Sequence, residues 1–142
     1  MSISSFTVLE ELDVSKSDVT EIGLAYLGQI RTLQCVSAGR CKTIEVGVGQ
    51  LASLENLREL NLPGFVMRDM TPEPEISLSH LKICANLVKL DIFYCTVSKN
   101  ETKGYACIAG LPLLEELRCQ QVDKTGLEHI AKIPRLRVLE IR

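Results

Sequence analysis

The sequence has few aromatic residues and no tryptophan: Phe, Tyr and Trp together make up only 4% of its 142 residues. A core must therefore be built mainly from Leu, Ile, Val and Cys. The apolar share of 46% is high enough for a chain that folds. Its length predicts a single domain with a sizeable core, covering residues 1–142.

The chain also lacks a run of basic residues, and its formal net charge is −2. We therefore expect no nucleic-acid partner and no membrane partner, since both select a basic patch. The opening MSISSFTVLEEL has no positively charged segment, and no apolar run is long enough to span a membrane. Without a secretory signal, the expected location is cytoplasmic or nuclear.

Catalytic motifs are missing as well. The sequence contains no G-x-S-x-G, no H-E-x-x-H and no glycine-rich loop that could cradle a phosphate. His80 and Cys84 could share one helix face, but a structural zinc ion needs four ligands and no second pair accompanies them. The sequence therefore predicts a protein that is not an enzyme and binds no cofactor and no metal.

The sequence does contain an internal repeat. At five places a small residue is followed by apolar residues one, four, seven and ten positions later. After Gly23, for example, these are Leu24, Leu27, Ile30 and Leu33. This pattern predicts a helix whose apolar stripe turns inward. The five small residues are Gly23, Gly47, Ser77, Gly104 and Gly126.

A strand pattern completes each unit. Six leucines occupy equivalent places, at intervals of 24, 24, 30, 27 and 22 residues, and apolar residues follow each at plus three and plus five. This alternation predicts a strand with one buried face. One unit cannot bury its own apolar face, whereas stacked units share a continuous core. The six leucines are Leu9, Leu33, Leu57, Leu87, Leu114 and Leu136.

The segments LENLRELNL and CANLVKLDIFYC resemble the leucine-rich repeat, LxxLxLxxN/C, and the glycine-containing half resembles its cysteine-containing, F-box-associated subtype. The resemblance implies an α/β fold: a right-handed solenoid of about six strands, with a curved parallel sheet on the concave face and helices on the convex face. Neither end shows a polar cap. We therefore expect a segment of a longer array, or else self-association through open sheet edges.

The cysteines fit this frame better than a disulfide framework. In the family, the slot eight residues after the first leucine holds Asn or Cys, turned inward to satisfy backbone groups. Here Ser17, Cys41 and Cys95 fill it. The two cysteines, two units apart, would lie roughly 10 Å from each other, too far to bridge. Cys84 and Cys119 fall on core positions, and Cys35 on the concave face is the candidate for a reactive thiol.

Side chains at plus two and plus four should point out of the concave face, where six carboxylates outnumber two basic groups. They predict either a groove for a partner rich in Lys or Arg, or simply a solvated sheet. We expect Phe93 and Tyr94 to be an exposed aromatic anchor, or to pack locally. The predicted partner-binding residues are Glu11, Asp13, Glu59, Asn61, Lys89, Asp91, Phe93, Tyr94, Glu116 and Arg118.

The predicted function is a non-catalytic protein–protein interaction scaffold that binds an unidentified protein on its concave face. The subtype implies an alternative, the substrate-recognition arm of a ubiquitin ligase whose F-box or RING domain is not in this sequence.

Two insertions lengthen the middle units. Residues 63–77, with Phe65 in the inward slot, are expected to fold back as a lid or to form a second contact patch. Residues 98–103 are expected to form an exposed loop.

Overall fold

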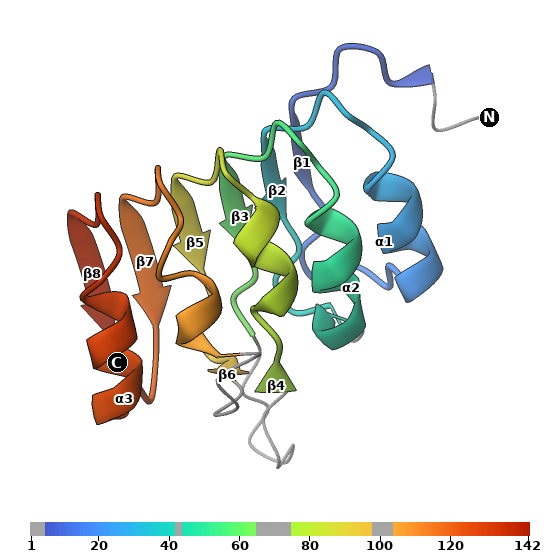
Figure 1. Ribbon diagram of the computed structural model, residues 1–142. Helices are drawn as coiled ribbons and strands as arrows, with labels where there is room; N and C mark the ends of the chain where they lie inside the picture. Colours follow the sequence, from blue (N-terminus) through green and yellow to red (C-terminus); the bar gives the residue numbers. More distant parts are fainter. Residues whose placement is uncertain (1–4, 42–43, 65–74, 98–103) are drawn as a thin grey trace.

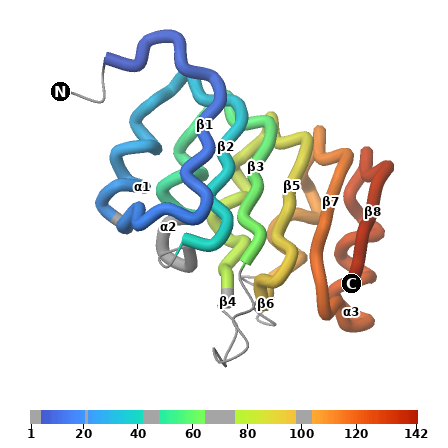
Figure 2. The backbone as a smooth tube through the Cα atoms, turned by 180° about the vertical axis from the view of Figure 1, so that it is seen from behind, coloured from blue at the N-terminus to red at the C-terminus, as the bar shows by residue number. Residues whose placement is uncertain are grey.

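The computed structural model describes residues 5–41, 44–64, 75–97 and 104–142. Its main element is one sheet of six parallel strands, with the helices packed on one face (Figures 1 and 2). This is the expected α/β solenoid. The strands, in their order across the sheet, are β1 (Glu11–Asp13), β2 (Cys35–Ser37), β3 (Glu59–Asn61), β5 (Lys89–Asp91), β7 (Glu116–Cys119) and β8 (Val138–Ile141).

Neighbouring strands pair without a slip in register. Glu11 lies opposite Cys35, and Cys35 lies opposite Glu59. The same register continues to β8. One carbonyl before each strand from β1 to β7 of the main sheet accepts two N–H groups of the next repeat, as Glu10 does from Gln34 (2.7 Å) and Cys35 (3.0 Å). This double acceptance recurs at the carbonyl groups of Gln34, Arg58, Val88 and Glu115.

The predicted alternation of buried and exposed side chains is confirmed in the inner strands. The leucine that opens each of these repeats and the residues at plus three and plus five are buried from β2 to β7. At β8 the equivalent Leu139 and Ile141 are 41% and 40% exposed, because no further described repeat packs against them. The core therefore lies between the sheet and the helices and runs continuously from unit to unit.

The helical segments differ in kind along the chain. Within the described part of the repeats, three are α-helices, α1 (Glu21–Leu27), α2 (Ile44–Leu51) and α3 (Lys124–Ile130), and two are 3₁₀ turns, η2 (Ser79–Ile83) and η3 (Tyr105–Cys107). The prediction of helices is thus right for the first, second and fifth units, whereas the third and fourth form only short 3₁₀ turns. No helix in the described part of the chain is long and apolar enough to cross a membrane.

Side-chain capping explains part of this difference. Thr20 accepts a hydrogen bond from the Gly23 N–H (3.3 Å) at the start of α1, and Asp123 accepts one from the Gly126 N–H (2.8 Å) at α3. The two 3₁₀ turns begin without a side-chain cap. A cap satisfies an N–H group that the first helical turn leaves open, and so favours the longer α-helix.

A second, two-stranded sheet lies at the carboxyl ends of the main strands (Figure 1). It pairs β4 (Glu75–Ile76) in parallel with β6 (Thr96–Val97). The sequence pattern did not predict this pair. Most of the two predicted insertions, at 65–74 and 98–103, lies outside the described residues. Phe65 and the segment expected to form a lid or a contact patch therefore lie outside them as well.

The inward slot works as predicted in the first, second and fourth units. The hydroxyl of Ser17 and the thiol of Cys41 (3.3 Å) both donate to the carbonyl of Val14, and the thiol of Cys95 donates to that of Leu62 (3.2 Å). The residue just before the slot is left-handed in four units, with φ between 51° and 61°. Each of these strands therefore ends in a tight turn that aims the next side chain into the core. The left-handed residues are Lys16, Arg40, Tyr94 and Gln121.

In the third unit Gly64 holds the equivalent position for a different reason, the close approach of the next repeat. Its N–H donates to the Phe93 carbonyl (2.6 Å), and an added Cβ would lie 2.1 Å from the carbonyl oxygen of Tyr94. Gly64→Ala is therefore expected to lower the free energy of unfolding by about 2–3 kcal/mol, since two backbone segments must move apart. Chemical denaturation measures the loss.

Gly110→Ala is the matched control, because nothing lies within 4 Å of an added Cβ there. It should change the free energy of unfolding by less than about 0.5 kcal/mol. Equal losses in the two variants would show that the close approach at Gly64 is not what requires glycine.

Candidate functional site

The register of the sheet lines up the outward side chains of the concave face in two columns. The first column contains Glu11, Cys35, Glu59, Lys89, Glu116 and Val138. The second contains Asp13, Ser37, Asn61, Asp91, Arg118 and Glu140. The charged residues predicted for partner binding therefore lie side by side on one surface, which we call the concave lattice. That they bind a partner stays a prediction.

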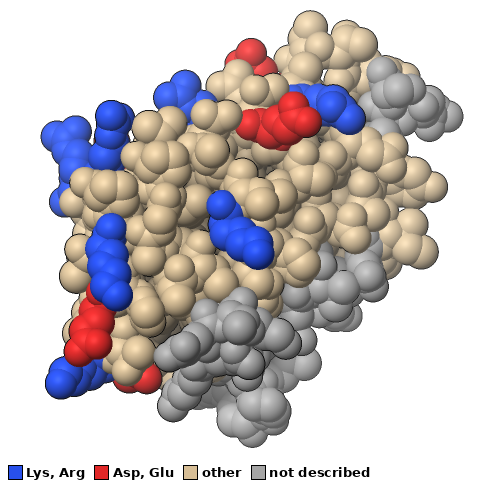
Figure 3. All heavy atoms as spheres, in the orientation of Figure 1, with Lys and Arg blue, Asp and Glu red and all other residues tan. Residues whose placement is uncertain are grey.

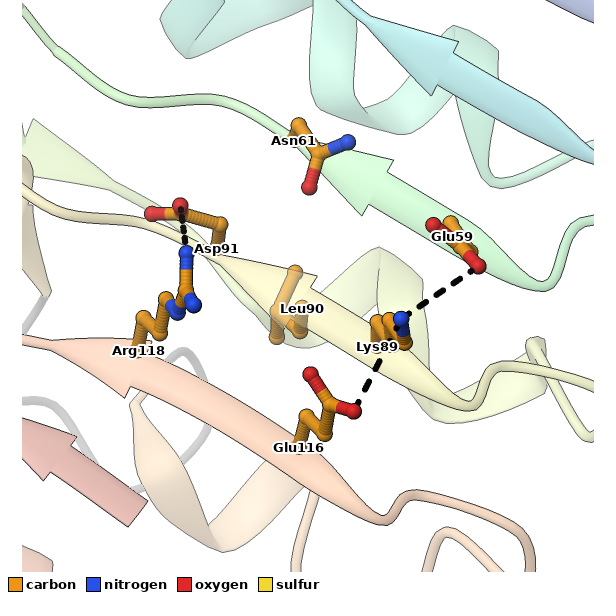
Figure 4. A pocket seen from close by; sticks show the side chains of 7 residues that line it. All are labelled: Glu59, Asn61, Lys89, Leu90, Asp91, Glu116 and Arg118. Carbon is orange, nitrogen blue, oxygen red and sulfur yellow. Dashed lines mark ion pairs between the residues drawn. The ribbon is translucent and has the colours of Figure 1, made fainter. Parts of the chain in front are cut away.

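The centre of the concave lattice is a hollow of about 180 Å³ over β3, β5 and β7 (Figure 4). Apart from Leu90, every residue lining it is charged or an amide. Asn61 donates to the hydroxyl of Ser37 in the neighbouring strand (3.2 Å). The lining residues are Glu59, Asn61, Lys89, Leu90, Asp91, Glu116 and Arg118.

Lys89 holds the first column together. Its ammonium nitrogen lies 3.7 Å from Glu59 Oε1 on one side and 3.6 Å from Glu116 Oε1 on the other (Figure 4). All three side chains are partly exposed, and pairs of this kind contribute only about 0.2–1 kcal/mol each to stability. Their main effect is to fix the positions of two carboxylates that share a single cation.

Arg118 does the same for the second column. Its Nη1 lies 3.8 Å from Asp91 Oδ2 and its Nε 3.4 Å from Glu140 Oε2. Asp91 is also held by the Phe93 N–H, which donates to Oδ1 (3.1 Å). The Asp91 carboxylate is therefore held both by the backbone N–H of Phe93 and by the guanidinium of Arg118.

The β1 side of the concave lattice is acidic. Neither Glu11 nor Asp13 forms an ion pair with a described residue. Hydrogen bonds from Ser15, including one from its N–H (2.8 Å), lower the pKa of Asp13, and the charge of Lys16 contributes to this shift, so this carboxylate stays ionised. Six carboxylates and two cations leave the two columns with a formal charge of −4. The opposite, helical side carries few charged side chains among its described residues (Figure 3).

Of the two alternatives for the aromatic pair, local packing is confirmed for Phe93, and the expectation that Phe93 is exposed is wrong. Its side chain is only 8% exposed, because the guanidinium of Arg142 lies over the ring, 4.9 Å from the centroid. Tyr94 remains 40% exposed, with its ring centroid 6.3 Å from that of Phe93. The aromatic pair thus offers one accessible ring, and the other is covered by a cation. Arg142 was not among the predicted site residues.

Cys35 does face the concave side, but its surroundings disfavour the reactive form. Burial raises the pKa of the Cys35 thiol, and the negative charges of Glu59 and Glu11 raise it further. Lys89 opposes this shift only in part. Since the thiolate is the nucleophile, the expectation of a reactive thiol has no support in this environment.

Four of the five remaining cysteines are buried, as the repeat predicts. All six are free thiols, and Cys41, Cys84, Cys95 and Cys119 are buried. Burial raises the pKa of Cys84 to about 11, and its thiol contacts the Ala52 carbonyl (3.8 Å). Burial also raises the pKa of Cys119 to about 11, although the neighbouring Tyr105 hydroxyl opposes the shift. Within the described ranges, no three His, Cys, Asp or Glu side chains converge on a possible metal position.

These two raised pKa values predict a loss of stability at alkaline pH. Between pH 9 and about 11 the thiols ionise in the unfolded chain but stay protonated in the folded one. The unfolded chain then binds fewer protons, so the free energy of unfolding falls as the pH rises through this window. Denaturation at pH 8 and at pH 10.5 measures the fall.

The variant Cys84→Ala/Cys119→Ala provides the control. It should be less stable than the parent at pH 8, because two buried side chains are shortened. Its further loss between pH 8 and pH 10.5 should be smaller. An unchanged alkaline loss would assign the effect to other groups.

Comparison with known proteins bears on the fold. No protein-family model matches the sequence, and no curated protein matches it either. Solved structures do match, among them an internalin from Listeria monocytogenes, at 17% sequence identity and a TM-score of 0.66. The alignment covers 99% of this chain and 45% of the internalin chain, so this chain spans less than half of that protein. The fold is a leucine-rich-repeat solenoid.

Proposed function

We propose that this leucine-rich-repeat solenoid is a non-catalytic protein-interaction module that binds another protein on its concave face. The observation that carries the proposal is the concave lattice, in which Lys89 and Arg118 each lie between two carboxylates at 3.4–3.8 Å. Side chains that are already positioned lose less freedom on binding. The surface is broad and open, as a protein partner requires.

The charge of this surface favours a partner that presents Lys or Arg. Glu11 and Asp13 form no ion pair with a described residue, and Glu59 and Glu116 share one cation. A carboxylate has about four lone-pair sites, so the shared ones can still accept donors from a partner. Such charges raise the association rate and exclude acidic partners more than they raise affinity. Tyr94, which follows β5, supplies a partly exposed aromatic side chain.

The finer expectations belong to this proposal as well. A role as the substrate-recognition arm of a ubiquitin ligase rests on the resemblance to the cysteine-containing subtype, and no particular contact in the described chain favours it. A cytoplasmic or nuclear location is compatible with six free thiols, which a reducing compartment preserves.

The concave lattice can be tested by removing charge without changing shape. The variant Glu59→Gln/Glu116→Gln should lose the partner that wild type captures from a cell lysate, as measured by cross-linking and mass spectrometry. Once the partner is identified, we expect it to associate with the variant about tenfold more slowly than with wild type at low salt. We also expect the association rate of the variant to depend less on ionic strength.

Glu55→Gln/Glu115→Gln is the matched control. It removes the same charge, and its carboxylates also pair with arginines, Arg31 and Arg137. Both lie before the strands rather than on the concave face. Retention of the partner by this variant supports the proposal. Equal loss in both variants, or no loss in the concave variant, would contradict it.

A further inference from the structure

A second hollow, of about 400 Å³, follows the edge of the sheet where the strands begin. In Figure 1 this is the upper edge, opposite β4 and β6. Each of its residues comes from the segment just before a strand, so it crosses four consecutive repeats. It shares no residue with the concave lattice. Its lining residues, which we call the edge groove, are Gln34, Asn56, Arg58, Asn86 and Leu113.

Two amides of the edge groove are fixed by the preceding repeat. Asn56 Nδ2 donates to the Arg31 carbonyl (2.9 Å), and Asn86 Nδ2 donates to the Glu55 carbonyl (2.9 Å). Each amide keeps a second N–H and a carbonyl oxygen for another partner. Neighbouring repeats therefore present a short ladder of oriented donors and acceptors, a pattern that suits a peptide backbone.

Arg58 is the charged residue of the edge groove, and it differs from the arginines around it. Arg137 holds the equivalent position in a later repeat and pairs with Glu115 (3.8 Å), while Arg31 pairs with Glu55 (3.6 Å). The exposed guanidinium of Arg58 forms no ion pair with any described residue, and its neighbour Gln34 has no side-chain hydrogen bond within the described ranges. The edge groove thus combines an uncompensated cation with open amide groups.

We infer that the edge groove binds an acidic segment of a partner protein, with an Asp or Glu carboxylate on Arg58. A guanidinium matches a carboxylate with two parallel N–H donors, which makes this pair directional. Gln34, Asn56 and Asn86 hydrogen-bond the adjoining peptide groups, and Leu113 contacts its aliphatic part. A phosphate is a poorer match, since the groove offers it one cation and no cluster of backbone N–H groups.

This site is independent of the proposed concave function and opposite to it in charge. The concave lattice selects basic groups, whereas the edge groove selects acidic ones. The two surfaces also lie on different parts of each repeat, since the groove residues precede the strands that carry the concave lattice. The solenoid therefore has two binding surfaces that can be lost separately.

The test is an NMR titration of the intact, ¹⁵N-labelled chain with a blocked peptide that carries two aspartates around a leucine. We expect saturable shifts of the Arg58 Nε–Hε resonance and of the Asn56 and Asn86 side-chain amides. Arg58→Gln should weaken binding about tenfold or more, because a charge-assisted pair is lost. The same peptide with asparagine in place of aspartate should bind no better than that variant.

Arg137→Gln is the matched control, at the same repeat position but with its own carboxylate partner, and it should bind the acidic peptide like wild type. Glu59→Gln/Glu116→Gln should do so too, which separates this site from the concave one. The proposal is overturned if acetate alone reproduces the shifts, if Arg137→Gln weakens binding as much as Arg58→Gln, or if the peptide moves none of these resonances. Backbone amide spectra confirm that each variant is folded.

Discussion

A backbone carbonyl that accepts two N–H groups of the following repeat is the contact on which the other features depend. It occurs before every strand interface of the six-stranded sheet, with N–O distances of 2.7–3.0 Å. Because it fixes where each strand starts, equivalent residues fall opposite one another. A slip of one residue would turn Leu60 and Leu90 outward and the charged residues into the core. Core packing and surface chemistry thus follow from one hydrogen-bond pattern.

The same pattern determines the electrostatics of the concave face. Strands about 4.8 Å apart place each charged side chain within reach of those on both neighbours. Lys89 and Arg118 can therefore pair in two directions, and each cation organises two carboxylates. These exposed pairs contribute little to stability. Their consequence is geometric, since they hold an excess of negative charge in a fixed arrangement.

Much of the fold and of the concave lattice could be predicted from the sequence, because the same weak strand pattern occurs in six aligned repeats. The strand starts, the two columns and the inward slot of Cys41 and Cys95 all follow from aligning one leucine in six places. The distinction between α-helix and 3₁₀ turn did not follow, although a signal was present. In the first and fifth units Thr20 and Asp123 each stand three residues before the glycine, as an N-cap does. The second unit has Ile44 at that place and is α-helical without this signal.

Contacts that reach past the adjacent repeat could not be predicted by aligning repeats. Phe93 follows β5 and Arg142 follows β8, so their contact crosses the repeat between them. The alignment of repeats places Phe93 and Arg142 on the concave side. It does not show that the Arg142 guanidinium covers the Phe93 ring. Arg58 was missed for a related reason. What distinguishes it from Arg137 is the absence of a carboxylate in reach among the described residues, and only the three-dimensional arrangement reveals this.

The small sheet of β4 and β6 makes the two long repeats structurally interdependent. These repeats, of 30 and 27 residues, are consecutive, and each contributes one strand of the pair beside its inserted segment. A repeat that lengthens alone would leave a strand edge without a backbone partner, whereas two adjacent repeats that lengthen together satisfy each other. Shortening one of them to the length of the others would therefore disturb its neighbour, while the columns of the main sheet keep their register.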